Sequence, residues 1–270
     1  MTWLAYAIFP AGPSAPAPES SRFPAGVDGA AVAFLKTGNL AVAVSRINGS
    51  EPPLGMEQVK QFHGVIQALF RNTVLIPMRY GCLFGTSQAI LDMLAAPGHD
   101  YPGLLETLGG CAEMGIRIDL LRHPDGPPGT PASPSPESPQ TGTAYLRTRQ
   151  AHYHRTDTQD QADDNLIQQY AAPFTSLARH WYPEKKPGPP RRLSLFFLVP
   201  QHRVQRFTRI YTHTAADMTG SSFLSGPWPP YNFVTRESGL LPHSPGDITG
   251  IPGMFTPATP PGSPGYRNRP

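Results

Sequence analysis

Residues 226–234 read GPWPPYNFV and place three prolines and three aromatic residues within nine positions. A regular helix or strand does not tolerate this, because proline lacks the amide hydrogen that both structures use. In one interpretation Trp228, Tyr231 and Phe233 pack inward and seal a core, while Pro229-Pro230 fixes the chain. In the other, the same rings form a docking surface for an apolar partner. The stretch follows a predicted strand, so we expect Trp228 to be largely buried against a second domain.

The composition is that of a chain only partly packed into domains. Its 270 residues include 34 prolines and 26 glycines, and only 15% are charged, whereas an average soluble domain has fewer prolines and more charges. The length suits two ordinary domains. A net charge of +3 from scattered lysines and arginines is too little for a nucleic-acid surface, which needs a basic stripe.

The cysteines and the apolar runs predict a cytoplasmic protein that contacts no lipid membrane. Cys82 and Cys111 are the two cysteines, and they lack metal-ligand spacing, so a reducing compartment is the simplest setting. The apolar run 3–9 has no basic region before it and no cleavage site after it, which predicts a first strand rather than a signal peptide. Other apolar runs are shorter than the ~18 residues of a membrane span.

Residues 1–121 alternate strand and helix patterns, which predicts an N-terminal α+β domain. AAVAFL and LAVAVS flank a turn at 36–39 and predict a hairpin. Apolar residues recur with helical spacing over 56–71. The other expected elements are strands at 73–76 and 114–121 and helices at 87–94 and 101–108.

The remaining chain divides into a linker, a second α+β domain and a tail. Residues 122–142 carry proline at nearly every third position, which predicts a Pro/Ser-rich linker. The second domain is expected over 143–238, and the Pro/Gly-rich residues 239–270 are expected to be a disordered tail. Within the second domain we expect helical patterns at 145–153, 166–181 (kinked or divided at Pro173) and 204–215, and strands at 193–199 and 221–224.

No motif for a metal, a cofactor or catalysis stands out. His152 and His154 are two residues apart, which places them on different sides of a helix. The acidic run containing Asp157, Asp160, Asp163 and Asp164 lacks the glycine and glutamate of a calcium loop and is better explained as a helix start. His63 lies on an apolar helix side, where a hydrogen-bonded core role is the usual one. We therefore expect no catalytic residues, no cofactor and no metal.

IPMRYG, residues 76–81, is the most informative stretch of the first domain. Arg79 follows a proline that ends a strand, and it lies between Met78 and Tyr80. Its guanidinium is suited either to an acidic partner or to carbonyl groups at the strand end. The structural role is the default, because most half-buried arginines serve packing.

In their order along the chain, several stretches resemble the gas vesicle GvpF/GvpL family. They are an N-terminal YAI strand, a histidine-bearing helix leading into TVLIPMRYG, the strand EMGIRI, then GTAYLRTR, FFLVP and GPWPPYNF. Each piece alone is weak, but their shared order spans about residues 3–234. GPWPPYNF is the most specific of them.

The resemblance implies two α+β domains, the second a modified ferredoxin-like fold with extra helices. It also implies a minor, non-enzymatic component of gas vesicles, the hollow protein-walled flotation organelles, which assists their assembly and contacts the small hydrophobic shell protein GvpA and other accessory proteins. The positions that match the family pattern, which we assign mainly to folding or interface roles, are Pro77, Met78, Arg79, Gly81, Tyr145, Leu146, Gly226, Pro227, Trp228, Pro229, Pro230, Tyr231 and Phe233.

The chain departs from the family pattern in its long proline-rich loop, in the Thr/Asp/Gln-rich segment after Arg155 and in its tail. Two other hypotheses remain beside the family role. An enzyme of unrecognised type would use His63 with Arg79 in one cleft. A nucleic-acid binder would need a basic surface and salt-sensitive binding.

Overall fold

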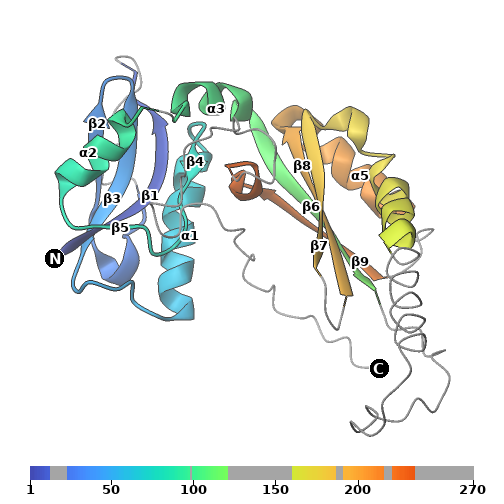
Figure 1. Ribbon diagram of the computed structural model, residues 1–270, viewed down its shortest axis with the longest axis horizontal. Helices are drawn as coiled ribbons and strands as arrows, with labels where there is room; N and C mark the ends of the chain where they lie inside the picture. Colours follow the sequence, from blue (N-terminus) through green and yellow to red (C-terminus); the bar gives the residue numbers. More distant parts are fainter. Residues whose placement is uncertain (13–22, 98, 121–159, 187–190, 216–220, 235–270) are drawn as a thin grey trace, which may run out of the picture. The chain divides into compact units, whose positions relative to one another are not determined.

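The computed structural model describes residues 1–12, 23–97, 99–120, 160–186, 191–215 and 221–234 (Figure 1). Contacts group them into two units. Unit 1 contains Met1–Glu113, Leu198–Gln201 and the described residues from Gly226 onward, and unit 2 contains the described residues of Met114–Phe197 and His202–Ser225. Helices accompany antiparallel sheets, so the predicted α+β class is confirmed. The expected domain boundaries at 121 and 143 fall at or within residues that are not described, and they stay a prediction.

The first sheet is built around β1 (Thr2–Pro10), whose residues 4–9 are all buried. Its strand order is β2-β3-β1-β4, with β5 (Leu83–Phe84) also paired to β1. The hairpin expected around 36–39 is confirmed, because β2 (Val32–Thr37) pairs antiparallel with β3 (Leu40–Ile47). β4 (Ile76–Pro77) is shorter than the predicted strand at 73–76. The amides of Asn72 and Thr73 bond instead to the carbonyl of Leu69 and complete the preceding helix end.

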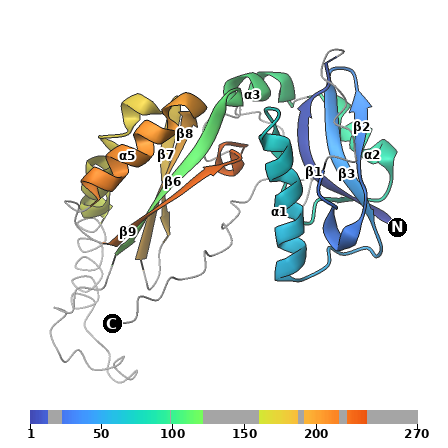
Figure 2. The same cartoon turned by 180° about the vertical axis from the view of Figure 1, so that it is seen from behind.

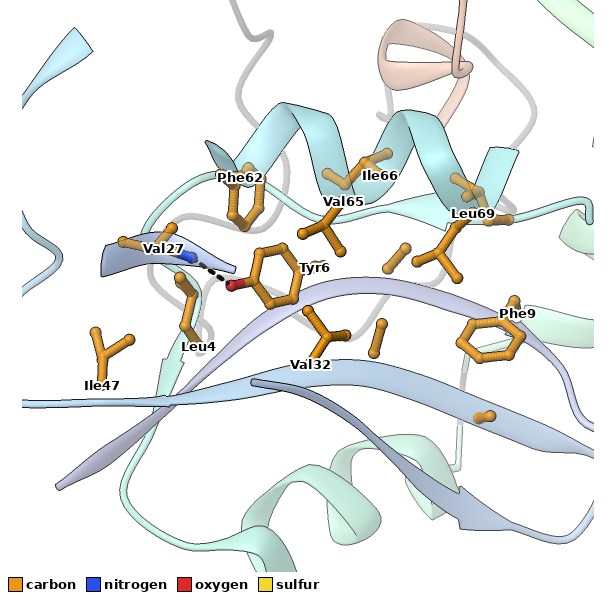
Figure 3. Close-up of a cluster of buried hydrophobic side chains, with 14 residues drawn as sticks. Leu4, Tyr6, Phe9, Val27, Val32, Ile47, Phe62, Val65, Ile66 and Leu69 are labelled. Atoms are coloured by element: carbon orange, nitrogen blue, oxygen red, sulfur yellow. Dashed lines mark hydrogen bonds between the residues drawn. The ribbon is translucent and has the colours of Figure 1, made fainter. Parts of the chain in front are cut away.

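Helix α1 (Met56–Phe70) confirms the periodic pattern and supplies one wall of the unit 1 core. Its buried residues Phe62, Val65, Ile66 and Leu69 pack against Leu4, Tyr6 and Phe9 of β1 (Figure 3). A register shift between Ala5 and Ala7 lets Ala7 and Phe9 face the same cluster as Leu4 and Tyr6. The Tyr6 hydroxyl is satisfied there, because it donates to Ser45 Oγ at 3.0 Å and accepts from the Val27 amide at 3.1 Å.

Two short helices complete unit 1 and begin where the sequence expects them. α2 (Ser87–Ala95) contacts β2, and α3 (Tyr101–Leu108) contacts β1 and β4. Thr86 Oγ1 accepts the Ala89 amide hydrogen at 3.1 Å, and Asp100 Oδ1 accepts that of Gly103 at 2.9 Å. Both helices therefore start at a side-chain N-cap, a device that stabilises the first turn.

The second sheet has the strand order β7-β8-β6-β9. Its strands are β7 (His180–Lys186), β8 (Arg191–Pro200), β6 (Cys111–Leu120) and β9 (Ser221–Trp228). Helix α5 (Val204–Thr214) packs against this sheet (Figures 1 and 2). Phe207 of α5 stacks on Phe174 with ring centroids 4.4 Å apart, and Phe197 of β8 lies 5.2 Å from Phe207. These three buried rings form the aromatic core of unit 2.

The helical pattern expected over 166–181 is wrong in its second half. Residues 160–171 are helical, a short turn of 3-10 helix follows at Thr175–Leu177, and Trp181 lies in β7. Pro173 has no amide hydrogen and disfavours helical backbone in the residue before it, so the helix ends there. Trp181 instead stacks on Phe197 across the strand pair at 6.0 Å.

Among the described residues, none of the helices is long and apolar enough to cross a membrane.

Candidate functional site

The stretch 226–234, called here the aromatic segment, belongs to unit 1. It consists of the end of β9 followed by the 3-10 turn η5 (Tyr231–Val234), which contacts β4. The Tyr231 amide donates to the Pro229 carbonyl at 2.7 Å. Pro229, Pro230, Asn232, Phe233 and Val234 are buried. The segment starts at Gly226, whose φ of 108° favours glycine, and the Gly226–Pro227 peptide bond is cis.

His63 of α1 is the first polar group that meets the aromatic segment. Its Nδ1 lies 3.0 Å from the Tyr231 hydroxyl, and its Nε2 lies 3.1 Å from Gln67 Nε2. Because the Gln67 amide donates to Nε2, the ring proton resides on Nδ1 and is donated to the Tyr231 oxygen. The Tyr231 ring stacks on the imidazole at 5.9 Å, and the Trp228 ring meets it edge-on at 5.6 Å. Burial lowers the pKa of His63, so the neutral ring is favoured.

Glu113 of β6 is the second polar group, and it is buried with 4% of its surface exposed. Its Oε2 accepts the backbone amide of Asn232 at 2.8 Å, and its Oε1 accepts the Asn232 side-chain amide at 2.5 Å. Burial raises the pKa of this carboxyl to about 7, although both hydrogen bonds from Asn232 act in the opposite direction. Burial, and to a smaller extent Glu113, also raises the pKa of Tyr231. The aromatic segment is therefore hydrogen-bonded to a buried acid whose pKa is raised towards neutral pH.

The expectation that Trp228 seals the second domain is wrong in its location. Trp228 is half-buried, and its ring contacts His63 within unit 1. Its indole Nε1 is buried and has no hydrogen-bond partner among the described residues. Phe233, with no exposed surface, is the ring that fills the core. The sequence could not show this, because α1 lies more than 150 positions before Trp228 in the chain.

The IPMRYG stretch includes β4, the strand that η5 of the aromatic segment contacts. The Met78 amide donates to the Tyr6 carbonyl at 2.8 Å, and the Cys82 amide donates to the Arg79 carbonyl at 3.2 Å. The Tyr80 hydroxyl donates to the Pro53 carbonyl at 2.5 Å. Pro77 and Met78 are buried, and Arg79 is half-buried. These contacts fasten the loop before α1 to the sheet.

Gly81 should be sensitive to substitution. Its φ is 96°, and an added Cβ would lie 3.3 Å from Cγ of Pro52. We expect Gly81→Ala to lower the free energy of unfolding by about 1–2 kcal/mol, since a side chain disfavours this backbone region. Gly85→Ala is the matched control, because a Cβ at Gly85 meets no atom within 4 Å. Urea denaturation compares the two variants, and equal losses would contradict the strain at Gly81.

Several residues that the sequence analysis singled out form ion pairs or lie outside the described residues. Asp163 pairs with Arg191, and Asp164 lies 2.7 Å from Lys185 Nζ. Tyr145, Leu146, His152, His154 and Asp157 are not among the described residues. The sequence analysis missed Glu113, Gln67 and Asn232. An acid within the otherwise apolar start of CAEMGIRI was the available signal for Glu113.

A cavity in unit 1 is separate from this cluster. It has a volume of about 210 Å³ and lies at the C-terminal end of α1, next to Arg71, Thr73 and Cys111. Neither His63 nor Arg79 lines it. The two residues of the enzyme hypothesis are therefore not brought together by this cavity.

Comparison with known proteins gives one consistent result. Residues 2–235 match the sequence model of the family described as gas vesicle synthesis protein GvpL/GvpF. The crystal structure of GvpF from Microcystis aeruginosa is similar with a TM-score of 0.67 and 15% identity, over 86% of this chain and 98% of that one. The crystal structure of GvpF from Anabaena sp. PCC7120 is similar with a TM-score of 0.64 and 14% identity. The similarity covers 86% of this chain and 95% of that one.

A search of curated protein sequences found no significant match. At 14–15% identity, the two crystal structures are evidence for the fold alone. The family match is evidence for the family, because it extends over nearly all of the described chain, including the aromatic segment and IPMRYG. The chain belongs to the gas vesicle GvpL/GvpF family.

Proposed function

We propose that this protein is a non-enzymatic accessory or minor structural protein of gas vesicles, located in the cytoplasm with the vesicles. In this role it binds the small hydrophobic shell protein of the GvpA type and assists vesicle assembly, together with other accessory proteins. The observation that carries the proposal is the family match over residues 2–235.

Elementary physics supports a binding role. A shell protein that lines a gas space has apolar surface before assembly, and such surface aggregates through exposed patches and open strand edges. A protein that offers a strand edge or an apolar surface protects it without catalysis. This chain has outer strands in both sheets, β2 and β7 among them. It also exposes Leu54 and Phe223, with 93% and 45% of their surfaces accessible.

We further propose that the chain folds as two domains, 1–121 and 143–238, joined by the linker 122–142. The division into two units supports two domains, although unit 1 also includes Leu198–Gln201 and the described residues from Gly226 onward. The second domain is proposed to be a modified ferredoxin-like fold. In its favour, β6, β7, β8 and β9 form one four-stranded sheet against which α5 packs.

The enzyme alternative gains no support from the described residues. Both ring nitrogens of His63 are engaged, one with Tyr231 and the other with Gln67. A general base needs a free nitrogen facing a substrate. The site is thus suited to holding the aromatic segment in place.

Co-expression with the shell protein tests the proposed function. The tagged chain should retain the shell protein on an affinity column, and an unrelated protein with the same tag should not. Deletion of the gene from its host should abolish buoyant vesicles, and a plasmid copy should restore them. Normal vesicles in the deletion strain, or no retention of the shell protein, would overturn the proposal.

A further inference from the structure

Helix α5 carries a line of basic side chains on the surface of unit 2. Arg206, Arg209 and His213 are three and four residues apart, which places them along one side of the helix. All three are exposed, whereas Phe207 on another side of the helix is fully buried. The segment 201–215 contains no acidic residue. The charged groups on this side of α5 are therefore all basic.

The two arginines of α5 are not used within the described part of the chain. Arg206 and Arg209 form neither an ion pair nor a side-chain hydrogen bond with any residue that the structure describes. Thr208 Oγ1 donates to the Val204 carbonyl at 3.1 Å, and Thr212 Oγ1 donates to the Thr208 carbonyl at 3.0 Å. These hydroxyl groups are satisfied inside the helix, whereas the guanidinium groups keep their N–H donors for a partner.

The helix at residues 160–171 has the opposite charge pattern. It carries Asp160, Asp163 and Asp164 and has no lysine or arginine. It lies on the same face of the second sheet as α5 (Figures 1 and 2). Asp163 is 7% exposed and is bound to Arg191, but Asp160 and Asp164 are exposed and lie one helical turn apart. Two acids therefore face solvent along one side of this helix.

The exposed acids are only partly neutralised by their own chain. Asp164 Oδ1 lies 2.7 Å from Lys185 Nζ, and the Asp164 side chain remains 56% exposed. Asp160 acts on the same lysine at longer range and forms no ion pair with a described residue. Neither acid pairs with Arg206 or Arg209, although both helices cover one face of the sheet. The opposite charges of the two helices are thus available to a second copy of the chain.

We propose that a second copy of this chain docks on unit 2, with α5 of each copy against the 160–171 helix of the other. In this arrangement Arg206 and Arg209 of one copy face Asp160 and Asp164 of the other. A two-fold axis repeats the same contact, so the assembly closes as a dimer. The proposal concerns self-association and does not depend on the shell protein.

A second copy fits the basic side of α5 better than a nucleic acid or a membrane. α5 offers two arginines, whereas proteins that bind nucleic acid at physiological salt typically contact about six or more phosphates. Anionic membranes attract clusters of about four to eight lysines and arginines. α5 also cannot insert its apolar side into a membrane, because Phe207 is buried in the core of unit 2. The acids at 160 and 164, one helical turn apart, match the spacing of the arginines.

The dimer should be weak and sensitive to salt, because exposed ion pairs contribute little individually. The screening length in water falls from about 10 Å at ~0.1 M salt to about 3 Å at ~1 M salt. We expect the dissociation constant of the dimer to rise at least about tenfold over this range. Sedimentation velocity of the full chain over a concentration series measures this constant.

Reversing the charge of one helix at a time tests the contact. Arg206→Glu/Arg209→Glu would place acids opposite Asp160 and Asp164, which should weaken self-association at least about tenfold. Asp160→Lys/Asp164→Lys would place cations opposite the arginines and should weaken it similarly. An equimolar mixture of the two variants should associate again, since both contacts of the mixed dimer then join opposite charges.

Lys36→Glu/Lys60→Glu is the matched control. Both lysines are exposed and belong to unit 1, and this variant changes the net charge by the same amount as Arg206→Glu/Arg209→Glu. It should self-associate like the wild type. Circular dichroism checks that every variant is folded. If Asp160→Lys/Asp164→Lys does not fold, Asp160→Lys alone replaces it, because Asp160 is exposed and has no ion pair to lose among the described residues.

Three results would each contradict the dimer. They are a wild-type chain that stays monomeric at low salt at every concentration reached, reversed variants that associate like the wild type, and a mixture that does not recover association. Polyglutamate and a duplex DNA fragment serve as competing probes. A low-salt monomer that binds either of them through Arg206 and Arg209 would assign the basic side of α5 to another class of partner, which would equally exclude the proposal.

Discussion

Replacing Phe233 by alanine is expected to lower the free energy of unfolding by about 3–5 kcal/mol. The ring has no exposed surface, and it lies in η5 between the buried residues Asn232 and Val234. Truncation removes the buried ring and leaves a cavity that the short proline-held turn cannot easily collapse. Urea denaturation of the full chain, followed by circular dichroism, measures the loss.

Phe223→Ala is the matched control for this substitution. Phe223 lies in β9 with 45% of its surface exposed, beneath the guanidinium of Arg117 at 5.5 Å. Removing the Phe223 ring should lower the free energy of unfolding by less than about 1 kcal/mol, because substitutions at the surface have small effects on stability. Trp228→Ala should fall between the two, since Trp228 is half-buried. If Phe233→Ala were as mild as Phe223→Ala, the aromatic segment would not be part of the core.

Local patterns predicted the elements that local interactions define. The helices at 56–70 and 101–108 and the hairpin around 36–39 appear where periodicity and turn residues place them. Each depends on interactions between residues a few positions apart, such as the Asp100 cap on Gly103. The order of the family motifs was also visible in the sequence alone.

Tertiary contacts decided the features that the sequence did not reveal. The apolar spacing that ends at Trp181 fits a helix, but pairing of β7 with β8 makes it a strand and places Trp181 on Phe197. The hydrogen-bond partner of Glu113, Asn232, lies more than 100 positions later in the chain. Trp228 likewise follows β9 in sequence but contacts α1 in space. Spacing along a chain carries no information about such distant partners.

Phe207→Ala, a substitution in unit 2, should also lower the free energy of unfolding by about 3–5 kcal/mol. The Phe207 side chain is fully buried and has two aromatic neighbours, Phe174 at 4.4 Å and Phe197 at 5.2 Å. Phe207 is the buried residue of α5, whereas Val204, Ile210 and Tyr211 are half-buried. Removing this ring therefore takes away the main attachment of α5 to the sheet.

The location of the damage distinguishes the two large substitutions. Hydrogen exchange in Phe207→Ala should accelerate first in α5 and around Phe174, which stacks on Phe207. In Phe233→Ala it should accelerate first in α1 and β1, because the aromatic segment belongs to unit 1. Subglobal opening confined to one contact unit is the expected behaviour of cooperative segments. If Phe233→Ala instead released α5 and left α1 protected, the aromatic segment would belong to the second domain, as its position in the sequence first indicates.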